Sequence, residues 1–148
     1  MGWENYHLHE FIVVNPKFGE VDHIGTPDNE GFNDAIIPEQ KRKISSYFSL
    51  GNTQGIYMYD FGDEWEHKIE LEKILPAEAG HLYPKCLAGK RACPPEDCGG
   101  MWGYENLLEI LKDPHHPEYQ DRLEWIGEPL NPEEFDSQSV LFSASKTG

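Results

Sequence analysis

Polar and apolar side chains alternate along the first stretch of the chain, from Trp3 to Val14 (WENYHLHEFIVV). A period of two that ends in β-branched residues predicts a β-strand. The same spacing places His7 and His9 on one face, which suits a pair of ligands, although a strand that simply begins polar shows this pattern too. After a turn-rich excursion, a short extended piece is expected near Val21 to Ile24.

The clearest strand pair is expected between Gly55 and Leu75, where two alternating runs flank Gly62-Asp63. A two-residue turn that begins with glycine suits a type II′ hairpin. That turn would place Phe61 opposite Glu64 and Met58 opposite His67. The predicted core face of the hairpin is then Ile56, Met58, Asp60, Trp65, His67, Ile69 and Leu71.

This register assigns two polar side chains, Asp60 and His67, to the core face. Buried polar groups need partners, so the pair is expected to bond to each other or to nearby backbone, with a catalytic or metal-binding pair as the alternative. The opposite face carries Tyr57, Tyr59 and Phe61 among carboxylates. These aromatic residues are a candidate surface for a protein partner, unless another layer of the chain covers them.

The second half of the chain changes to the helical period. Tyr104, Leu107, Leu108 and Leu111 share one face of a helix that Pro114 ends. A second helix is predicted from Pro117, with Gly127 as its end.

All three cysteines lie between these halves, with six residues between Cys86 and Cys93 and four between Cys93 and Cys98. Structural zinc sites are built on tight knuckles, and no C-x2-C knuckle is present. Three interpretations remain open: a zinc site completed by His81, His67 or Asp97, buried structural thiols, or a disulfide.

The net charge of the chain argues against some classes of function, above all nucleic-acid binding. The chain has 148 residues, 38% of them hydrophobic, and a net charge of -15. An acidic chain repels phosphate backbones, so nucleic-acid binding is disfavoured, and Lys41 to Lys43 is its one short basic cluster. No apolar run reaches the roughly 18 residues of a membrane span. An odd number of cysteines favours a reducing, cytoplasmic setting.

Four strings of the sequence resemble a known family, the Ri-plasmid open-reading-frame-three-like (pRiA-type) proteins. They are MGWENYHLHEF, YMYDFGDEWEHKIELE, the cysteine stretch CLAGKRACPPEDCGGMWGY and DPHHPEY, at residues 1–11, 57–72, 86–104 and 113–119. The resemblance implies an α+β fold, with a twisted, mostly antiparallel sheet, a central hairpin and helices mainly in the C-terminal half. It also implies a single domain over residues 1–148, which agrees with the predicted hairpin and helices.

Members of that family usually carry a segment with strands and a helix before the MGW string. The chain therefore resembles an N-terminally shortened member, or Met1 is an internal methionine of a longer reading frame. If the missing segment normally pairs with the sheet, we expect an uncovered sheet edge or apolar patch.

The sequence is compatible with three hypotheses of function. The first is a non-enzymatic cytoplasmic adaptor that binds a protein partner, with a structural zinc in the cysteine loop as an option. The second is a metal-dependent hydrolase that uses the histidine, aspartate and cysteine groups. The third is a mobile-element protein acting on DNA, because some family members carry a transposon-resolvase label. The sequence lacks a serine or tyrosine nucleophile beside an arginine cluster, so that label gains no support.

Overall fold

The structure is a computed structural model that describes residues 2–27 and 36–142. The chain contains two compact units, residues 5–76 and residues 1–4 with 77–148. The expectation of a single domain stays a prediction.

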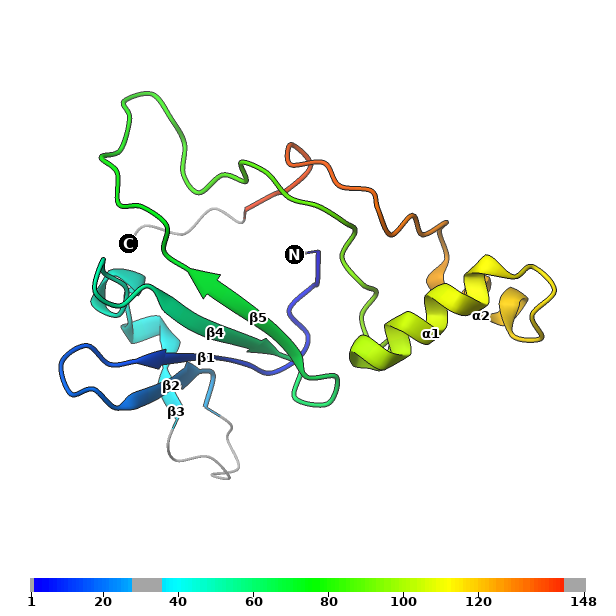
Figure 1. Cartoon of the computed structure of the whole chain (residues 1–148), viewed down its shortest axis with the longest axis horizontal. Coiled ribbons are helices and arrows are strands. Elements are labelled where there is room, and N and C mark those ends of the chain that lie inside the picture. Colours follow the sequence, from blue (N-terminus) through cyan, green and yellow to red (C-terminus); the bar gives the residue numbers. More distant parts are fainter. Residues whose placement is uncertain (1, 28–35, 143–148) are drawn as a thin grey trace. The chain divides into compact units, whose positions relative to one another are not determined.

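The unit of residues 5–76 is built on a five-stranded sheet (Figure 1). Its strands are β1 (His9–Val14), β2 (Val21–Gly25), β3 (Ile36–Pro38), β4 (Gln54–Tyr59) and β5 (Trp65–Glu70). The order across the sheet is β3-β2-β1-β4-β5, and only β2 and β3 pair in parallel. The predicted α+β class and mostly antiparallel sheet are confirmed. The β4–β5 hairpin forms one side of the sheet, and β1 occupies the centre.

The predicted register of the hairpin is wrong by one residue. Tyr57 lies opposite His67 and Tyr59 opposite Trp65, because five residues, not two, connect the strands. Asp60 and Glu64 both adopt positive φ angles (59° and 54°), and the Glu64 N–H donates to the Asp60 carbonyl. Since side chains alternate along a strand, a slip of one residue moves a whole strand's side chains to the other face.

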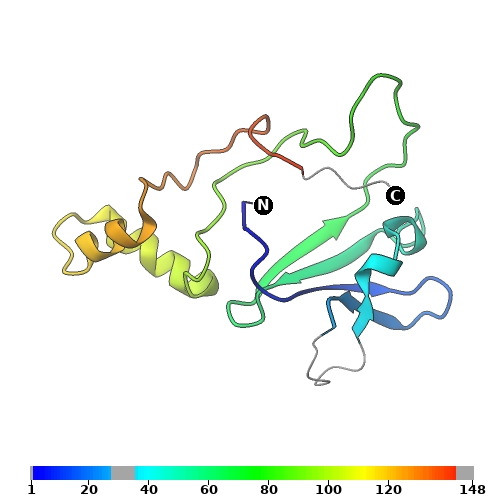
Figure 2. The same ribbon diagram turned by 180° about the vertical axis from the view of Figure 1, so that it is seen from behind.

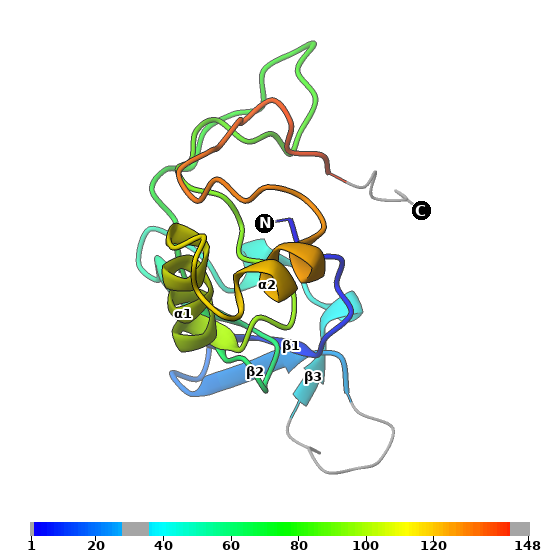
Figure 3. The ribbon, with the colours of Figure 1, turned by 90° about the vertical axis from the view of Figure 1, so that its right-hand side faces the viewer.

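A short segment with two turns of 3-10 helix, η1 (Glu39–Lys41) and η2 (Ile44–Ser46), leads to Tyr47 and Phe48. These two aromatic side chains pack with Val13 and Ile24 in the hydrophobic core, so this segment covers one face of the sheet. The same unit is seen from behind in Figure 2, and Figure 3 shows β3 beside β2.

The second unit contains α1 (Gly100–Lys112) and α2 (Tyr119–Ile126), which confirms two helices in the C-terminal half. Leu107 and Ile110 on α1 are 3% and 2% exposed. Gly127 ends α2 with a positive φ of 76°, a conformation that glycine adopts without strain.

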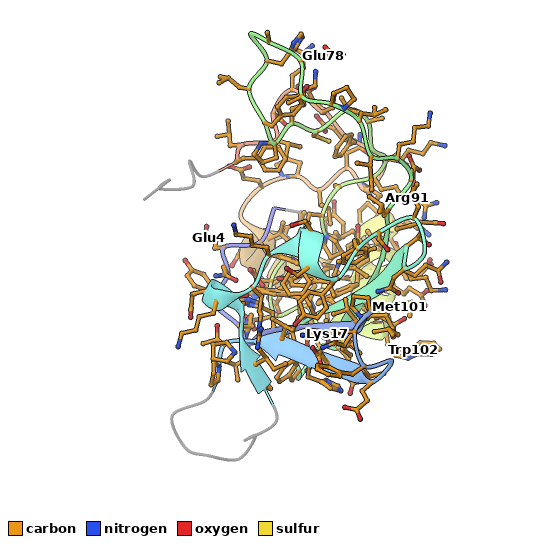
Figure 4. The ribbon with its side chains drawn as sticks, turned by 90° about the vertical axis from the view of Figure 1, so that its left-hand side faces the viewer. Glu4, Lys17, Glu78, Arg91, Met101 and Trp102 are labelled. Atoms are coloured by element: carbon orange, nitrogen blue, oxygen red, sulfur yellow. The ribbon has the colours of Figure 1, made fainter. Side chains whose placement is uncertain are left out.

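The first turn of α1 presents apolar side chains to solvent. Met101 and Trp102, labelled in Figure 4, are strongly exposed. Among the described residues, no helix is long and apolar enough to span a bilayer.

Candidate functional site

The covered face of the sheet gathers most of the chain's candidate functional groups. The observed register places His9 and Phe11 of β1 beside Tyr57 and Tyr59 of β4, and these beside Trp65 and His67 of β5. Four of these rings contact one another around Tyr57, with centroid distances of 4.8 Å for Phe11–Tyr57, 5.7 Å for His9–Tyr57 and 5.6 Å for Tyr57–His67. Three neighbouring strands thus hold these side chains on one rigid surface.

His7 and Asp60 form the first histidine–carboxylate pair. The His7 Nε2 lies 3.6 Å from the Asp60 Oδ2, and Asp60 as a whole is only 8% exposed. The Oδ1 of Asp60 accepts hydrogen bonds from the backbone N–H groups of Gly62 (2.9 Å) and Asp63 (3.3 Å). The loop therefore fixes a carboxylate that can orient an imidazole, as general-base sites require.

His9 and Glu39 form a second pair on the same face. The His9 Nε2 lies 3.0 Å from the Glu39 Oε2, and the His9 side chain is 11% exposed. Its ring also contacts the Tyr57 ring, at a centroid distance of 5.7 Å. The His9 Nδ1 is buried, and no hydrogen-bond partner is found for it in the described part of the chain.

The expected pair of Asp60 and His67 is replaced by other contacts. The register shift brings His67 opposite Tyr57, and its Nδ1 lies 3.1 Å from the Tyr57 carbonyl oxygen. Asp60, in the hairpin loop, contacts His7 instead.

The three hairpin aromatics do not form one exposed surface. Tyr59 is 2% exposed, Tyr57 is half-buried and Phe61 is 42% exposed in the loop. Burial raises the pKa of Tyr57, and the charges of Tyr59 and Glu39 raise it further, so its hydroxyl keeps its proton. As a group, these residues are therefore unsuited to the predicted partner surface.

A pocket of about 110 Å³ opens next to the His9–Glu39 pair. Glu39, Arg42 and Lys43 contribute its charged lining. The apolar lining consists of Phe11, Val13, Ile24, Ile44, Tyr47 and Phe48.

The opposite face of the sheet, which we name the open face, is far less covered. Cross-strand partners Val14 and Val21 are 41% and 56% exposed, and Ile12 pairs with Ile56 in the neighbouring row. A shallow hollow of about 380 Å³ lies over these residues and extends to Lys68 and Glu70 on β5. The open face therefore carries an apolar patch with access to solvent.

The cysteine loop does not assemble the predicted zinc ligands. Among the residues described, no three of Cys86, Cys93, Cys98 and His81 bring their ligand atoms within 4.8 Å of one another. No disulfide joins the three cysteines, all of which lie in the described residues, and His81 pairs with Glu78 at 3.3 Å. A structural zinc in this loop would need a rearrangement, and it stays a prediction that metal analysis would test.

Cys93 and Cys98 nevertheless both lie near Tyr104. Burial raises the pKa of the Cys93 thiol, despite the lowering effect of a backbone hydrogen bond from Gly2. Burial also raises the pKa of Tyr104, and the charges of Cys98 and Cys93 add to that effect. These observations favour the interpretation of Cys93 as a structural thiol.

Sequence reasoning missed several residues of the covered face, above all Glu39, Arg42 and Tyr47. Their segment shows no periodic pattern, and its position against the sheet depends on long-range packing. The usable signal was the pair of His7 and His9, although only His9 lies on a strand: β1 begins at His9, and His7 lies in the bend before it, where it meets Asp60.

Comparisons of this chain with protein families, with other sequences and with solved structures each found a similar protein. A family described as "Plasmid pRiA4b ORF-3-like protein" matches residues 1–139. The chain is 38% identical over 143 residues to the uncharacterized protein y4hQ of Sinorhizobium fredii, covering 97% of this chain and 68% of that protein. It is also similar to the crystal structure of MM3350, a protein of unknown function from Methanosarcina mazei Go1. That match has a TM-score of 0.87 and 53% identity, and covers 96% of this chain and 77% of the other.

Proposed function

The chain belongs to the plasmid pRiA4b ORF-3-like family, and from that premise we propose that it is a non-enzymatic adaptor of the cytoplasm that binds a protein partner through the open face of its sheet. One observation carries this proposal. The cross-strand rows Val21–Val14 and Ile12–Ile56 form an apolar strip with solvent access on a rigid sheet. A sheet face with such a strip is stabilised when another layer covers it.

The charged side chains around the strip indicate which charge a partner should carry. Glu66, Lys68 and Glu70 are exposed on β5, on the same face, and Glu10 pairs with His23 at 2.8 Å. Since the chain as a whole carries a net charge of -15, the open face favours a basic partner. An amphipathic helix with an apolar stripe between lysines fits both properties.

A synthetic helical peptide of about 18 residues tests this surface directly. One peptide carries a leucine stripe between lysines, and a matched peptide carries glutamates in place of the lysines. We expect saturable, salt-sensitive binding of the lysine peptide, measured by fluorescence anisotropy, and much weaker binding of the glutamate peptide.

Variants of the open face locate the binding. Val14→Glu and Val21→Glu place charges in the strip, and each should weaken binding of the lysine peptide at least tenfold. Leu50→Glu is the matched control, because Leu50 is 73% exposed but lies outside the strip. Equal losses for Leu50→Glu and Val21→Glu would reject this surface. A stable dimer in sedimentation experiments that Val21→Glu dissociates would show that a second copy covers it instead.

A metal-dependent hydrolase is the second candidate, and the His7–Asp60 pair favours it. An imidazole nitrogen and a carboxylate oxygen 3.6 Å apart are two of the ligand types that zinc prefers. The backbone donors of Gly62 and Asp63 hold the carboxylate in place.

Metal titration of the full chain separates the two candidates. The hydrolase hypothesis expects zinc binding that His7→Ala and Asp60→Asn abolish, together with metal-dependent hydrolysis of model esters or phosphoesters. Retained zinc binding in both variants would rule out this pair as a metal site.

A further inference from the structure

The pocket beside the His9–Glu39 pair combines an apolar interior with charges of both signs. Aliphatic and aromatic side chains from β1, β2 and the covering segment line its interior. Glu39, Arg42 and Lys43 also line the pocket, so one acidic and two basic residues border one small cavity. A ligand that fills it therefore needs an apolar group and both a negative and a positive group.

The two basic residues at the border of this pocket suit a ligand with an anionic group. Arg42 and Lys43 form no ion pair with any carboxylate in the described ranges, 2–27 and 36–142. Arg42 lies close enough to Tyr47 that its charge opposes the rise in the pKa of that phenol. In a chain with 27 acidic and 12 basic side chains, two adjacent basic residues with no ion-pair partner among the described residues are an unusual local excess of positive charge.

Glu39 supplies the opposite charge. Its Oε2 is engaged by the His9 Nε2 at 3.0 Å, which leaves Oε1 for another donor. An ammonium group next to Glu39 would gain a charge-assisted hydrogen bond, whereas a carboxylate there would be repelled.

We propose that this pocket binds a free amino acid with a branched aliphatic side chain. The side chain enters the apolar interior, the α-carboxylate faces Arg42 and Lys43, and the α-ammonium faces Glu39. Size supports the aliphatic choice, because about 110 Å³ is smaller than the roughly 150 Å³ cavity that accepts a benzene ring.

The wall of the pocket is preorganised. The Tyr47 hydroxyl donates to the Asp22 Oδ2 (3.0 Å), and Asn15 Nδ2 donates to the same oxygen (2.8 Å). Asn52 Nδ2 donates to the carbonyls of Tyr47 (2.7 Å) and Val14 (2.9 Å), which ties the covering segment to the sheet. A rigid wall lowers the entropy lost when a small ligand binds.

Titration of the full chain with L-leucine, followed by ¹H–¹⁵N NMR, tests the proposal. We expect saturable shifts at Val13, Ile24 and Tyr47. Two analogues each remove one charge: 4-methylpentanoate lacks the ammonium group, and leucinamide lacks the carboxylate. Each should bind about tenfold more weakly than L-leucine, and L-alanine should bind more weakly because it leaves the apolar interior unfilled.

Charge variants repeat the test on the protein side. Arg42→Gln and Glu39→Gln should each weaken L-leucine binding about tenfold. Glu39→Gln should narrow the difference between L-leucine and 4-methylpentanoate, because the ammonium group loses its partner. Lys41→Gln is the matched control, because it removes a charge from the same basic run but does not line the pocket, so its effect should stay below about twofold.

Three results would overturn the proposal. They are the absence of saturable shifts with L-leucine at millimolar concentrations, equal binding of L-leucine and its two analogues, and equal effects of Lys41→Gln and Arg42→Gln. The pocket lies on the face opposite to the open face, so these outcomes are independent of the test with helical peptides.

Discussion

The two faces of the sheet share the same strands but differ in what covers them. On the covered face, Val13 and Tyr59 are 4% and 2% exposed, and Tyr47 and Phe48 close over the core. On the open face, Val14 and Val21 keep about half of their surface in solvent. Neighbouring residues of one strand, Val13 and Val14, therefore lie in opposite environments.

This difference in exposure suggests different roles for the apolar residues of the two faces: those of the covered face pack the core, and those of the open face are available to bind a partner. Apolar side chains on the covered face stabilise the fold through burial. Those of the open face contribute little to the stability of the isolated chain, so their exposure needs another explanation, which partner binding supplies. Three matched pairs of substitutions and Tyr47→Phe test how much the buried residues of the covered face contribute to stability compared with more exposed positions.

The largest effect is expected at Tyr59. Tyr59→Ala removes an almost fully buried aromatic ring and should lower the free energy of unfolding by about 3–5 kcal/mol. Phe61→Ala, at 42% exposure in the hairpin loop, should cost less than about 1 kcal/mol. Urea unfolding followed by tryptophan fluorescence measures both, and similar losses would show that the hairpin aromatics form one surface after all.

The adjacent valines give the most closely matched pair. Val13→Ala creates a cavity under Tyr47 and should cost about 2 kcal/mol. Val14→Ala should stay within about 0.5 kcal/mol. If Val14→Ala destabilises the chain as much as Val13→Ala, the open face is covered in solution.

Gly55 tests how tightly the covered face is packed. An added Cβ would lie 2.7 Å from the Val13 Cγ1 and 2.9 Å from the Phe48 Cζ. We expect Gly55→Ala to cost about 1–2 kcal/mol, because a close-packed core tolerates extra volume poorly. Gln54→Ala, at the preceding exposed position, is the control and should be near neutral. A neutral or stabilising Gly55→Ala would indicate that the covering segment yields easily.

The smallest effect is expected at the Tyr47 hydroxyl. Burial, followed by the hydrogen bond to Asp22, raises the pKa of Tyr47 above its ordinary value of 10.0. The folded chain then keeps a proton that the unfolded chain releases, so stability is unaffected below pH 10 and falls as the pH rises beyond it.

Tyr47→Phe should cost about 1 kcal/mol at neutral pH through the lost hydrogen bond, and should make the alkaline loss of stability shallower. Unfolding curves between neutral pH and pH 11 (about one unit above the ordinary tyrosine value) measure both effects. An unchanged alkaline slope would place the phenol in contact with water.

Local pattern was sufficient for much of the fold. Alternation identified the two strands beside Gly62-Asp63 and the second half of the strand predicted from Trp3 to Val14, which begins only at His9. The helical period with Pro114 and Gly127 identified both helices. Strands and helices depend mainly on residues that are close in the sequence, so periodicity and turn residues are sufficient to predict them.

Tertiary structure alone decided the register and the site. The Asp60 N–H donates to the carbonyl of Leu8, far away in sequence, and this contact accompanies the five-residue loop that brings Tyr57 and His67 together. The cysteines are close in sequence, yet their sulfurs do not converge as a set of metal ligands. Arg42, in an apparently solvated basic run, lines a pocket with Glu39 because Tyr47 and Phe48 anchor that segment on the sheet. Contacts between these side chains depend on how segments that are distant in the sequence pack together. That packing is set by the burial of the whole core, and a local sequence pattern does not encode it.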